Sequence, residues 1–444
     1  MPGLRARARL SSYKTAGRPL AKQSFLRHTI RMVDNHQLEK LIVPRFMQYA
    51  RYNTESDRHA AATPSTEGQW DLARALRDEL AGLGIKDVKL TDHCYVIARL
   101  PPSAGKENAP AIGFMAHMDT ASDVSGKDVK PQLVKAYDGK KIALSGGLFL
   151  DPETEPDLAE QKGKAIIHAD GSTLLGADNK AGIAEIMAAV EYLLAHPEIQ
   201  HGAIEIIFTP DEETGKGLSQ FPVGEIKAAA CYTLDGGAIG SVEIECFNAW
   251  KAQVKFAGKV IHIGAARGIL VNASLMAAAF ALMLPRSESP EATDGYFGYY
   301  CPMEIQGNLE SASLEVYLRD FERAGMDRRV KALEAFAKAV EAQFPGGKVE
   351  VIATPQYYNM KEKINEKPQA LEKLNRALDS LGIKCRLNPI RGGTDGSRLT
   401  EMGIPTPNIF TGGRNFHSRL EWVSVPEMAA ACALVIELAK LWGE

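Results

Sequence analysis

Seven side chains that can bind metal ions or carry protons occur in separate segments of this 444-residue sequence. They are two imidazoles and five carboxylates, and most of them follow a short apolar run: His117, Asp119, Asp178, Glu212, Glu213, Asp235 and His417. Zinc and similar ions accept imidazole nitrogen and carboxylate oxygen, and two such ions about 3.5 to 4 Å apart can share a carboxylate and a water. This combination of residue types indicates a two-metal hydrolase.

Three apolar runs are expected to position these residues, over residues 111–115, 204–208 and 229–234. Short continuous apolar runs are typical of strands buried on both faces of a parallel sheet. In open α/β sheets, ligands bind beyond the carboxyl ends of the strands, so segments far apart in the sequence meet along one edge. Between two of these runs, apolar residues recur at helical spacing from Ile183 to Leu194, and Pro197 ends this predicted helix.

The residue types suggest how two ions would divide their ligands. His117 and Asp235 would bind one ion, and Glu213 and His417 would bind the other. Asp178 would bind both ions, as a bridging carboxylate does.

Two acidic residues remain outside this division. Asp119 lies two residues after His117, so it could accept the other N–H of that imidazole and fix its tautomer. Glu212 lies beside Glu213 and is free to take a proton from the bridging water. Plainer readings exist for the same residues, because an Asp can cap a helix that begins near Lys180, and paired Glu residues can form a solvated turn.

Several longer stretches resemble one known family. They occur in the same order from about residue 40 to the C-terminus, and they include GFMAHMDTASDVSGK, LLGADNKAGIAEIM, FTPDEETGKG, YTLDGG and PIRGGTDGSRL. The chain resembles the co-catalytic metallopeptidases of the aminoacylase and carboxypeptidase type, and within them the aminopeptidases that act on tripeptides. The resemblance implies the same ligand division, Glu212 as general base and a cis peptide bond between Asp178 and Asn179. It also implies two divalent ions per subunit, zinc before manganese or cobalt, which the same ligands accept.

The segment after Asp235 changes in character. Its pattern predicts strands over residues 251–256, 303–306, 314–319 and 348–352, with helices over residues 271–284 and 326–344. The order βαββαβ is that of a ferredoxin-like unit. Since this unit lies between Asp235 and His417, we expect it to be an insertion in an α/β catalytic domain with a mixed, mostly parallel sheet flanked by helices.

These observations predict four parts of the chain. A basic N-terminal extension, expected to be disordered, covers residues 1–31, because this region carries Arg and Lys without acids and lacks the apolar core of a secretory signal. The catalytic domain is expected to cover residues 32–246 and 356–444. Residues 247–355 would form a lid and dimerisation domain.

Three further residues are candidates through the resemblance. His262 lies in His-Ile-Gly-Ala-Ala, where the family usually has His-Pro-Gly-x-Ala, and is implied to stabilise the oxyanion. In the family this histidine comes from the partner subunit, which implies a homodimer. Arg319, in YLRDFER, and Arg391, in RGGTDG, are predicted to bind the substrate, Arg391 through a bidentate grip on a carboxylate.

Composition is consistent with a cytoplasmic enzyme acting on small peptides. The net charge of −3 gives no basic field that would attract nucleic acid or an anionic membrane. No apolar stretch approaches the roughly 18 residues of a membrane span. Six cysteines without CxxC spacing suit reduced thiols in the cytoplasm.

The predicted function is therefore an aminopeptidase that removes the N-terminal residue of tripeptides. The alternative is another amide hydrolase with the same machinery, namely a dipeptidase, a carboxypeptidase or an N-acyl amino-acid deacylase. The tripeptidase and these other hydrolases have the same metal ligands, so the ligand set does not distinguish them. A non-catalytic relative would need a missing ligand or base, and neither is missing.

Overall fold

An eight-stranded mixed sheet carries most of the chemistry-bearing segments, in the order β1-β2-β8-β3-β9-β16-β10-β15. The computed structural model describes residues 34–444, and the predicted basic extension over residues 1–31 lies outside them. The central strands of the sheet, β8, β3, β9 and β16, are parallel. Strands β1 and β2 pair antiparallel with their neighbours, and β10 is antiparallel to β16 but parallel to β15. The strands are β1 (Asp87–Leu90), β2 (Val96–Leu100), β3 (Ile112–His117), β8 (Ile204–Thr209), β9 (Ala230–Gly236), β10 (Ser241–Glu243), β15 (Arg386–Leu387) and β16 (Asn408–Phe410).

The three apolar runs form β3, β8 and β9, as predicted. Every residue of β3 and β8 is buried, because the strands are covered on both faces. Their carboxyl ends are neighbours, since β3 pairs in parallel with both β8 and β9. The predicted fold class, a mixed and mostly parallel sheet flanked by helices, is confirmed.

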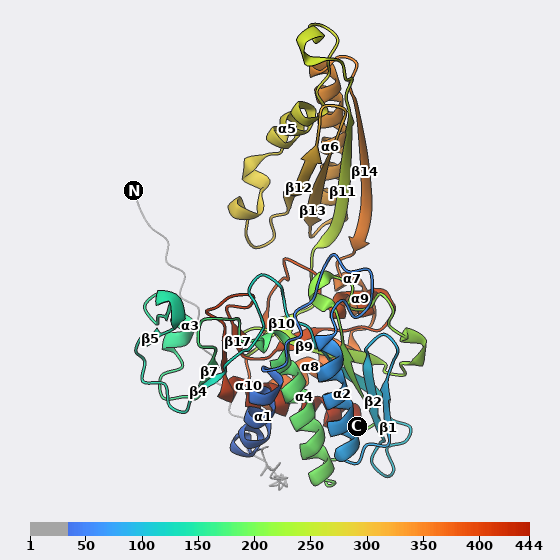
Figure 1. Cartoon of the computed structure of the whole chain (residues 1–444). Coiled ribbons are helices and arrows are strands. Elements are labelled where there is room, and N and C mark those ends of the chain that lie inside the picture. The colour runs from blue at the N-terminus through green and yellow to red at the C-terminus, as the bar shows by residue number, and fades with distance from the viewer. Residues whose placement is uncertain (1–33) are drawn as a thin grey trace, which may run out of the picture. The chain divides into compact units, whose positions relative to one another are not determined.

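The helix predicted from the Ile183 to Leu194 periodicity is α4 (Ala177–Ala195), which packs against β3, α1 (Asn35–Tyr49) and α10 (Val425–Trp442) (Figure 1). The peptide bond between Asp178 and Asn179 is cis, as the family resemblance implied. The other helices of the described chain outside the inserted segment are α2 (Gly68–Gly82), α3 (Pro156–Ala159), α7 (Lys361–Glu366), α8 (Gln369–Ser380) and α9 (Asp395–Glu401). No helix within residues 34–444 is long and apolar enough to cross a membrane.

A smaller sheet, β17-β18-β7-β4, was not predicted from the sequence. Its strands have only two or three residues, too few for an alternating pattern to be recognised, and β5 (Ile142–Ala143) and β6 (Phe149–Leu150) form a separate pair. Its importance lies in the segment between β17 and β18, which carries His417. The strands are β4 (Gln132–Val134), β7 (Ile166–His168), β17 (Gly413–Arg414) and β18 (Trp422–Ser424).

The inserted segment forms a four-stranded antiparallel sheet in the order β12-β13-β11-β14, with helices α5 and α6 packed on it (Figure 1). This confirms the predicted βαββαβ order. Leu314, Val316 and Leu318 face the helices in one apolar core. The elements are β11 (Asn248–Ala257), α5 (Ala273–Met283), β12 (Tyr299–Gly307), β13 (Ser311–Asp320), α6 (Arg323–Gln343) and β14 (Lys348–Tyr357).

The bounds of these elements have local causes. The side chain of Asn272 accepts hydrogen bonds from two backbone N–H groups at the start of α5, so the helix begins after Val271 rather than at it. The chain leaves α6 before Pro345, and Gly346 adopts a positive φ of 91°. The domain boundaries at residues 247 and 355 remain predictions.

Candidate metal centre and active site

The predicted ligands converge at the carboxyl ends of the parallel strands. His117 ends β3, and Asp235 is the penultimate residue of β9. Asp178 lies in the first turn of α4, and Glu213 lies in the short 3-10 helix η2 (Glu212–Thr214) that follows β8. His417 comes from the segment between β17 and β18.

Two groups of potential ligands share one carboxylate. In the first group, His117 Nε2 lies 2.9 Å from Asp178 Oδ1 and 3.5 Å from Asp235 Oδ1. In the second, His417 Nε2 lies 3.2 Å from Asp178 Oδ2 and 3.0 Å from Glu213 Oε2. Within each group the candidate ligand atoms lie within 4.8 Å of one another. The structure thus brings together the five residues that the sequence divided between two ions, with Asp178 in the shared position.

The charges of this cluster fit a bound cation. Burial, reinforced by the nearby Asp178 carboxylate, raises the pKa of Glu213 to about 7, and burial likewise raises the pKa of Asp235 to about 7. One oxygen of Glu213, Oε1, is buried and has no hydrogen-bond partner within the described chain. Hydrogen bonds to Asp178 and Glu213 raise the pKa of His417 to about 11, so the carboxylates hold its proton. A divalent ion would replace these protons and stabilise the buried carboxylates.

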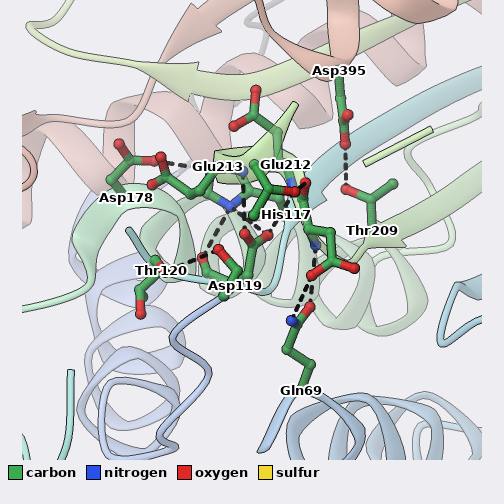
Figure 2. Close-up of polar contacts among 12 residues, drawn as sticks. Gln69, His117, Asp119, Thr120, Asp178, Thr209, Glu212, Glu213 and Asp395 are labelled. Carbon is green, nitrogen blue, oxygen red and sulfur yellow. Dashed lines mark hydrogen bonds and ion pairs between the residues drawn. The ribbon is translucent and has the colours of Figure 1, made fainter. Parts of the chain in front are cut away.

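Asp119 joins the first histidine to the turn that follows β8 (Figure 2). Its two carboxylate oxygens accept hydrogen bonds from the backbone N–H groups of Glu212, at 2.9 Å, and Glu213, at 3.1 Å. His117 Nδ1 lies 3.4 Å from Asp119 Oδ1 and 3.0 Å from the Asp119 carbonyl oxygen. Asp119 therefore both orients His117 and fixes the backbone of η2.

Glu212 is adjacent to this cluster and makes no ion pair within residues 34–444. Burial raises the pKa of its carboxyl well above the usual range, opposed by the His117 imidazole. A carboxylate whose pKa is raised is a stronger base than an exposed one, as general-base catalysis requires.

Residues 153–441 match the sequence model of peptidase family M20/M25/M40. The chain belongs to this family. The family resemblance and the predicted enzyme class, a metallopeptidase, are thereby confirmed.

Curated relatives named peptidase T are similar along nearly the whole chain. Peptidase T of Geobacillus kaustophilus is 44% identical over 409 residues, which cover 92% of this chain and 99% of the relative. Peptidase T of Clostridium perfringens is 46% identical over 405 residues, 91% of this chain and 100% of the relative.

Two solved structures of peptidases show the same fold. Aminopeptidase PepT from Bacillus cereus aligns with a TM-score of 0.71 at 23% identity and covers 93% of this chain and 100% of its own. The YXEP protein of Bacillus subtilis, described as a dinuclear metal binding peptidase, aligns with a TM-score of 0.62 at 14% identity, covering 91% of this chain and 98% of its own.

Three buried acids near the M20 centre were missed by reading the sequence. Glu421 accepts three backbone hydrogen bonds at the start of α4. Asp395 accepts a hydrogen bond of 2.5 Å from Thr209 Oγ1 at the end of β8 (Figure 2). Asp211 accepts hydrogen bonds from Ser65 and Gln69, which hold the loop before η2. A single acid within an apolar run, as in LEWVSV, is the signal that could have found Glu421.

The lid candidates lie in the inserted segment and do not contact the metal ligands. His262 is exposed at the start of the 3-10 helix η4 (Ile263–Ala265), and its Nδ1 accepts a hydrogen bond from the N–H of Gly264. Arg319, on β13, is 8% exposed, and its guanidinium lies over the rings of Tyr317 and Tyr357. No carboxylate pairs with Arg319 anywhere in residues 34–444, although buried arginines usually have such a partner.

Arg391 uses its guanidinium on the backbone of the inserted segment. Nη1 donates to the carbonyl oxygens of Gly295 and Phe297, at 2.9 and 2.8 Å. Nη2 donates to the carbonyl and hydroxyl oxygens of Thr293, at 3.1 and 2.8 Å. In this structure, therefore, Arg391 connects its loop to residues 293–297, and its predicted role in substrate binding remains a prediction.

Proposed function

We propose that this protein is a di-metal aminopeptidase that removes the N-terminal residue of tripeptides. The observation that carries the proposal is the shared position of Asp178 between the two imidazole and carboxylate groups, with Glu212 beside them. The similarity to relatives named peptidase T supports the substrate class. The ligands would be His117 and Asp235 for one ion, Glu213 and His417 for the other, and Asp178 for both.

Two bound divalent ions would polarise the scissile carbonyl and lower the pKa of a bound water towards neutrality. Within this chain, Glu212 accepts the proton of the attacking water at a carboxylate oxygen and later delivers it to the leaving amine. Asp119 keeps His117 in the tautomer that offers Nε2 to a ligand, because it faces Nδ1. The nitrogen and oxygen ligands suit zinc, and they accept manganese and cobalt as well.

Arg319 is the better supported of the two substrate-binding arginines. Its buried positive charge has no carboxylate partner within the described chain, and the tyrosine rings hold it in place. A peptide carboxylate would supply the missing negative charge. Arg391 would act on the substrate only after releasing residues 293–297.

We further propose that residues 247–355 form a lid through which two subunits associate, with His262 as the oxyanion donor supplied to the partner. Strand β12 is an edge strand of its sheet, and Met303 and Ile305 on it are exposed. An exposed edge strand is a template for pairing with a second chain. The cytoplasm is the proposed compartment, in keeping with free cysteines throughout the described chain.

The test is hydrolysis of a free tripeptide, its N-acetylated form and a dipeptide by the zinc-loaded protein. We expect cleavage of the free tripeptide alone, lowered by about 10² to 10⁴-fold in Glu212→Ala. Glu225→Ala, which removes an exposed acid paired with Lys89, should leave the rate unchanged. Cleavage of the acetylated peptide or the dipeptide instead would make the protein another amide hydrolase of the family.

A further inference from the structure

The loop that presents the shared carboxylate is held by an acid from a distant part of the chain. Glu421 Oε2 accepts hydrogen bonds from the N–H groups of Leu175, at 2.7 Å, and Gly176, at 2.8 Å. Glu421 Oε1 accepts a hydrogen bond of 3.0 Å from the N–H of Asp178 itself. Three N–H groups at the amino end of a helix form a strong site for a carboxylate. The backbone of Asp178 is thus fixed by a side chain 243 residues away.

The partner of this loop is the segment that also supplies the second histidine. His417 and Glu421 lie four residues apart between β17 and the first residue of β18. His417 Nε2 approaches Asp178 Oδ2 at 3.2 Å, while Glu421 binds the Asp178 N–H. One short segment therefore contacts Asp178 at both its side chain and its backbone.

The close contacts of the Glu421 carboxylate are with this loop, although its charge also acts on the buried Lys180. Glu421 is 1% exposed, and no Lys, Arg or His in residues 34–444 forms an ion pair with it. All of its hydrogen bonds from the protein come from backbone N–H groups of the loop 175–178. A carboxylate used in this way fixes the position of a backbone.

We propose that Glu421 is a positioning residue for the metal centre, which sets the place of Asp178 and so the binding of both ions. The inference rests on the proposed di-metal function. Since Asp178 is the shared ligand, displacement of its backbone would disturb both groups of ligands at once. Residues behind metal ligands typically contribute about 10 to 100-fold to metal affinity.

The chain offers a matched control in Glu205. This residue is also 1% exposed, and its carboxylate accepts hydrogen bonds from the consecutive N–H groups of Lys227 and Ala228. It lies near the start of β8, at the opposite end from the candidate metal ligands. Glu205 also forms an ion pair with Arg99, so Glu205→Gln removes an equally buried carboxylate that has at least as many partners as Glu421, without touching the site.

The experiment is a zinc titration of the metal-free full chain, in competition with a coloured zinc chelator, with unfolding by denaturant measured on the same samples. We expect two zinc ions per wild-type chain, an affinity about 10 to 100-fold lower in Glu421→Gln, and an unchanged affinity in Glu205→Gln. In the tripeptide assay at fixed zinc, Glu421→Gln should lower kcat, with KM within about twofold, because Glu421 acts through a ligand.

The outcomes separate the two proposals. A folded Glu421→Gln that binds two zinc ions with wild-type affinity overturns the positioning role and leaves the proposed function intact. Equal losses of affinity in Glu421→Gln and Glu205→Gln also overturn it, since they would reflect stability alone. A wild-type chain that fails to bind two ions overturns the di-metal function itself. If Glu421→Gln does not fold, Glu421→Asp replaces it in the titration. This variant keeps the charge but has a shorter side chain, and we expect the same loss of zinc affinity.

Discussion

Buried carboxylates meet different partners at the two ends of the central strands. At the amino end, Glu205 forms an ion pair of 3.0 Å with Arg99, which in turn pairs with Asp87 at 3.2 Å. At the carboxyl end, the ion pairs that Asp178 and Asp235 form within residues 34–444 are all with the imidazoles of His117 and His417. The same sheet thus contains a compensated acid cluster and an uncompensated one.

The difference follows from the cost of burying charge. A buried carboxylate needs a cation or several N–H donors, and without them its pKa rises. At the amino end Arg99 and two backbone N–H groups meet this need, so the strands are stable there without a ligand. At the carboxyl end, no Lys or Arg of residues 34–444 forms an ion pair with Asp178 or Asp235, and a metal ion is the partner that these acids require.

The largest expected effects are a loss of stability from a substitution at the amino end of the strands and a loss of activity from a substitution at the carboxyl end. Glu205→Ala removes the partner of Arg99 and leaves buried N–H groups unpaired, so we expect a loss of about 3 kcal/mol in the free energy of unfolding. Asp178→Asn removes the shared ligand, so tripeptide cleavage should fall by more than about 100-fold. Without metal, Asp178→Asn should destabilise the folded chain less than Glu205→Ala does, because Asn can still accept hydrogen bonds from His117 and His417 and only the charge attraction to these imidazoles is lost. Denaturant unfolding and initial rates measure both effects, and a metal-free Asp178→Asn as unstable as Glu205→Ala would contradict the comparison.

Metal removal should destabilise the carboxyl ends of the central strands and leave their amino ends unchanged. Chelation should lower the free energy of unfolding by about 2.7 kcal/mol if zinc was present at about 100 times its dissociation constant. Amide hydrogen exchange should speed up at Glu212 and Glu213, whose N–H groups bind Asp119, and stay unchanged at Lys227 and Ala228. Equal acceleration at both ends would show that the ions stabilise the whole sheet rather than the site.

The contrast between the two ends also explains what the sequence could predict. His117, Asp178 and Asp235 were recognisable because each lies in a short motif at or near an apolar run, and strand ends in a parallel sheet must meet. The ferredoxin-like segment was recognisable from its alternating strands and its helices.

Glu421 and Asp395 were missed for a physical reason. Each acts on a backbone or a hydroxyl group far away in the sequence, and such pairing leaves no periodic pattern. Arg391 shows the converse, since its motif indicated a carboxylate grip, while the structure directs its donors to the carbonyl oxygens of residues 293–297.

A third kind of acid tests the argument from the opposite side. Glu185, on α4, is 0% exposed, and neither of its carboxyl oxygens has a hydrogen-bond partner within the described chain. Burial raises its pKa well above the ordinary value of 4.5. With neither an arginine ion pair nor metal ligands beside it within residues 34–444, this carboxyl keeps its proton to a higher pH in the folded chain than in the unfolded chain.

The sign of the resulting pH dependence is fixed. Below pH 4.5 the carboxyl is protonated in both the folded and the unfolded chain, so its titration makes no contribution to the pH dependence of stability there. As the pH rises, the unfolded chain loses the proton while the folded chain keeps it, so stability falls by up to about 1.4 kcal/mol per pH unit until the folded pKa is reached. Glu185→Gln cannot ionise, and it should therefore be more stable than the wild type at pH 8 and similar to it at pH 4.5.

Denaturant unfolding of the metal-free protein at several pH values measures this difference. Glu191→Gln is the control on the same helix, because Glu191 forms an ion pair with Arg45 and its loss should lower stability at pH 8. If Glu185→Gln is instead less stable than the wild type at pH 8, the carboxyl is ionised and compensated, and burial without a cation would not be what distinguishes the acids of this fold.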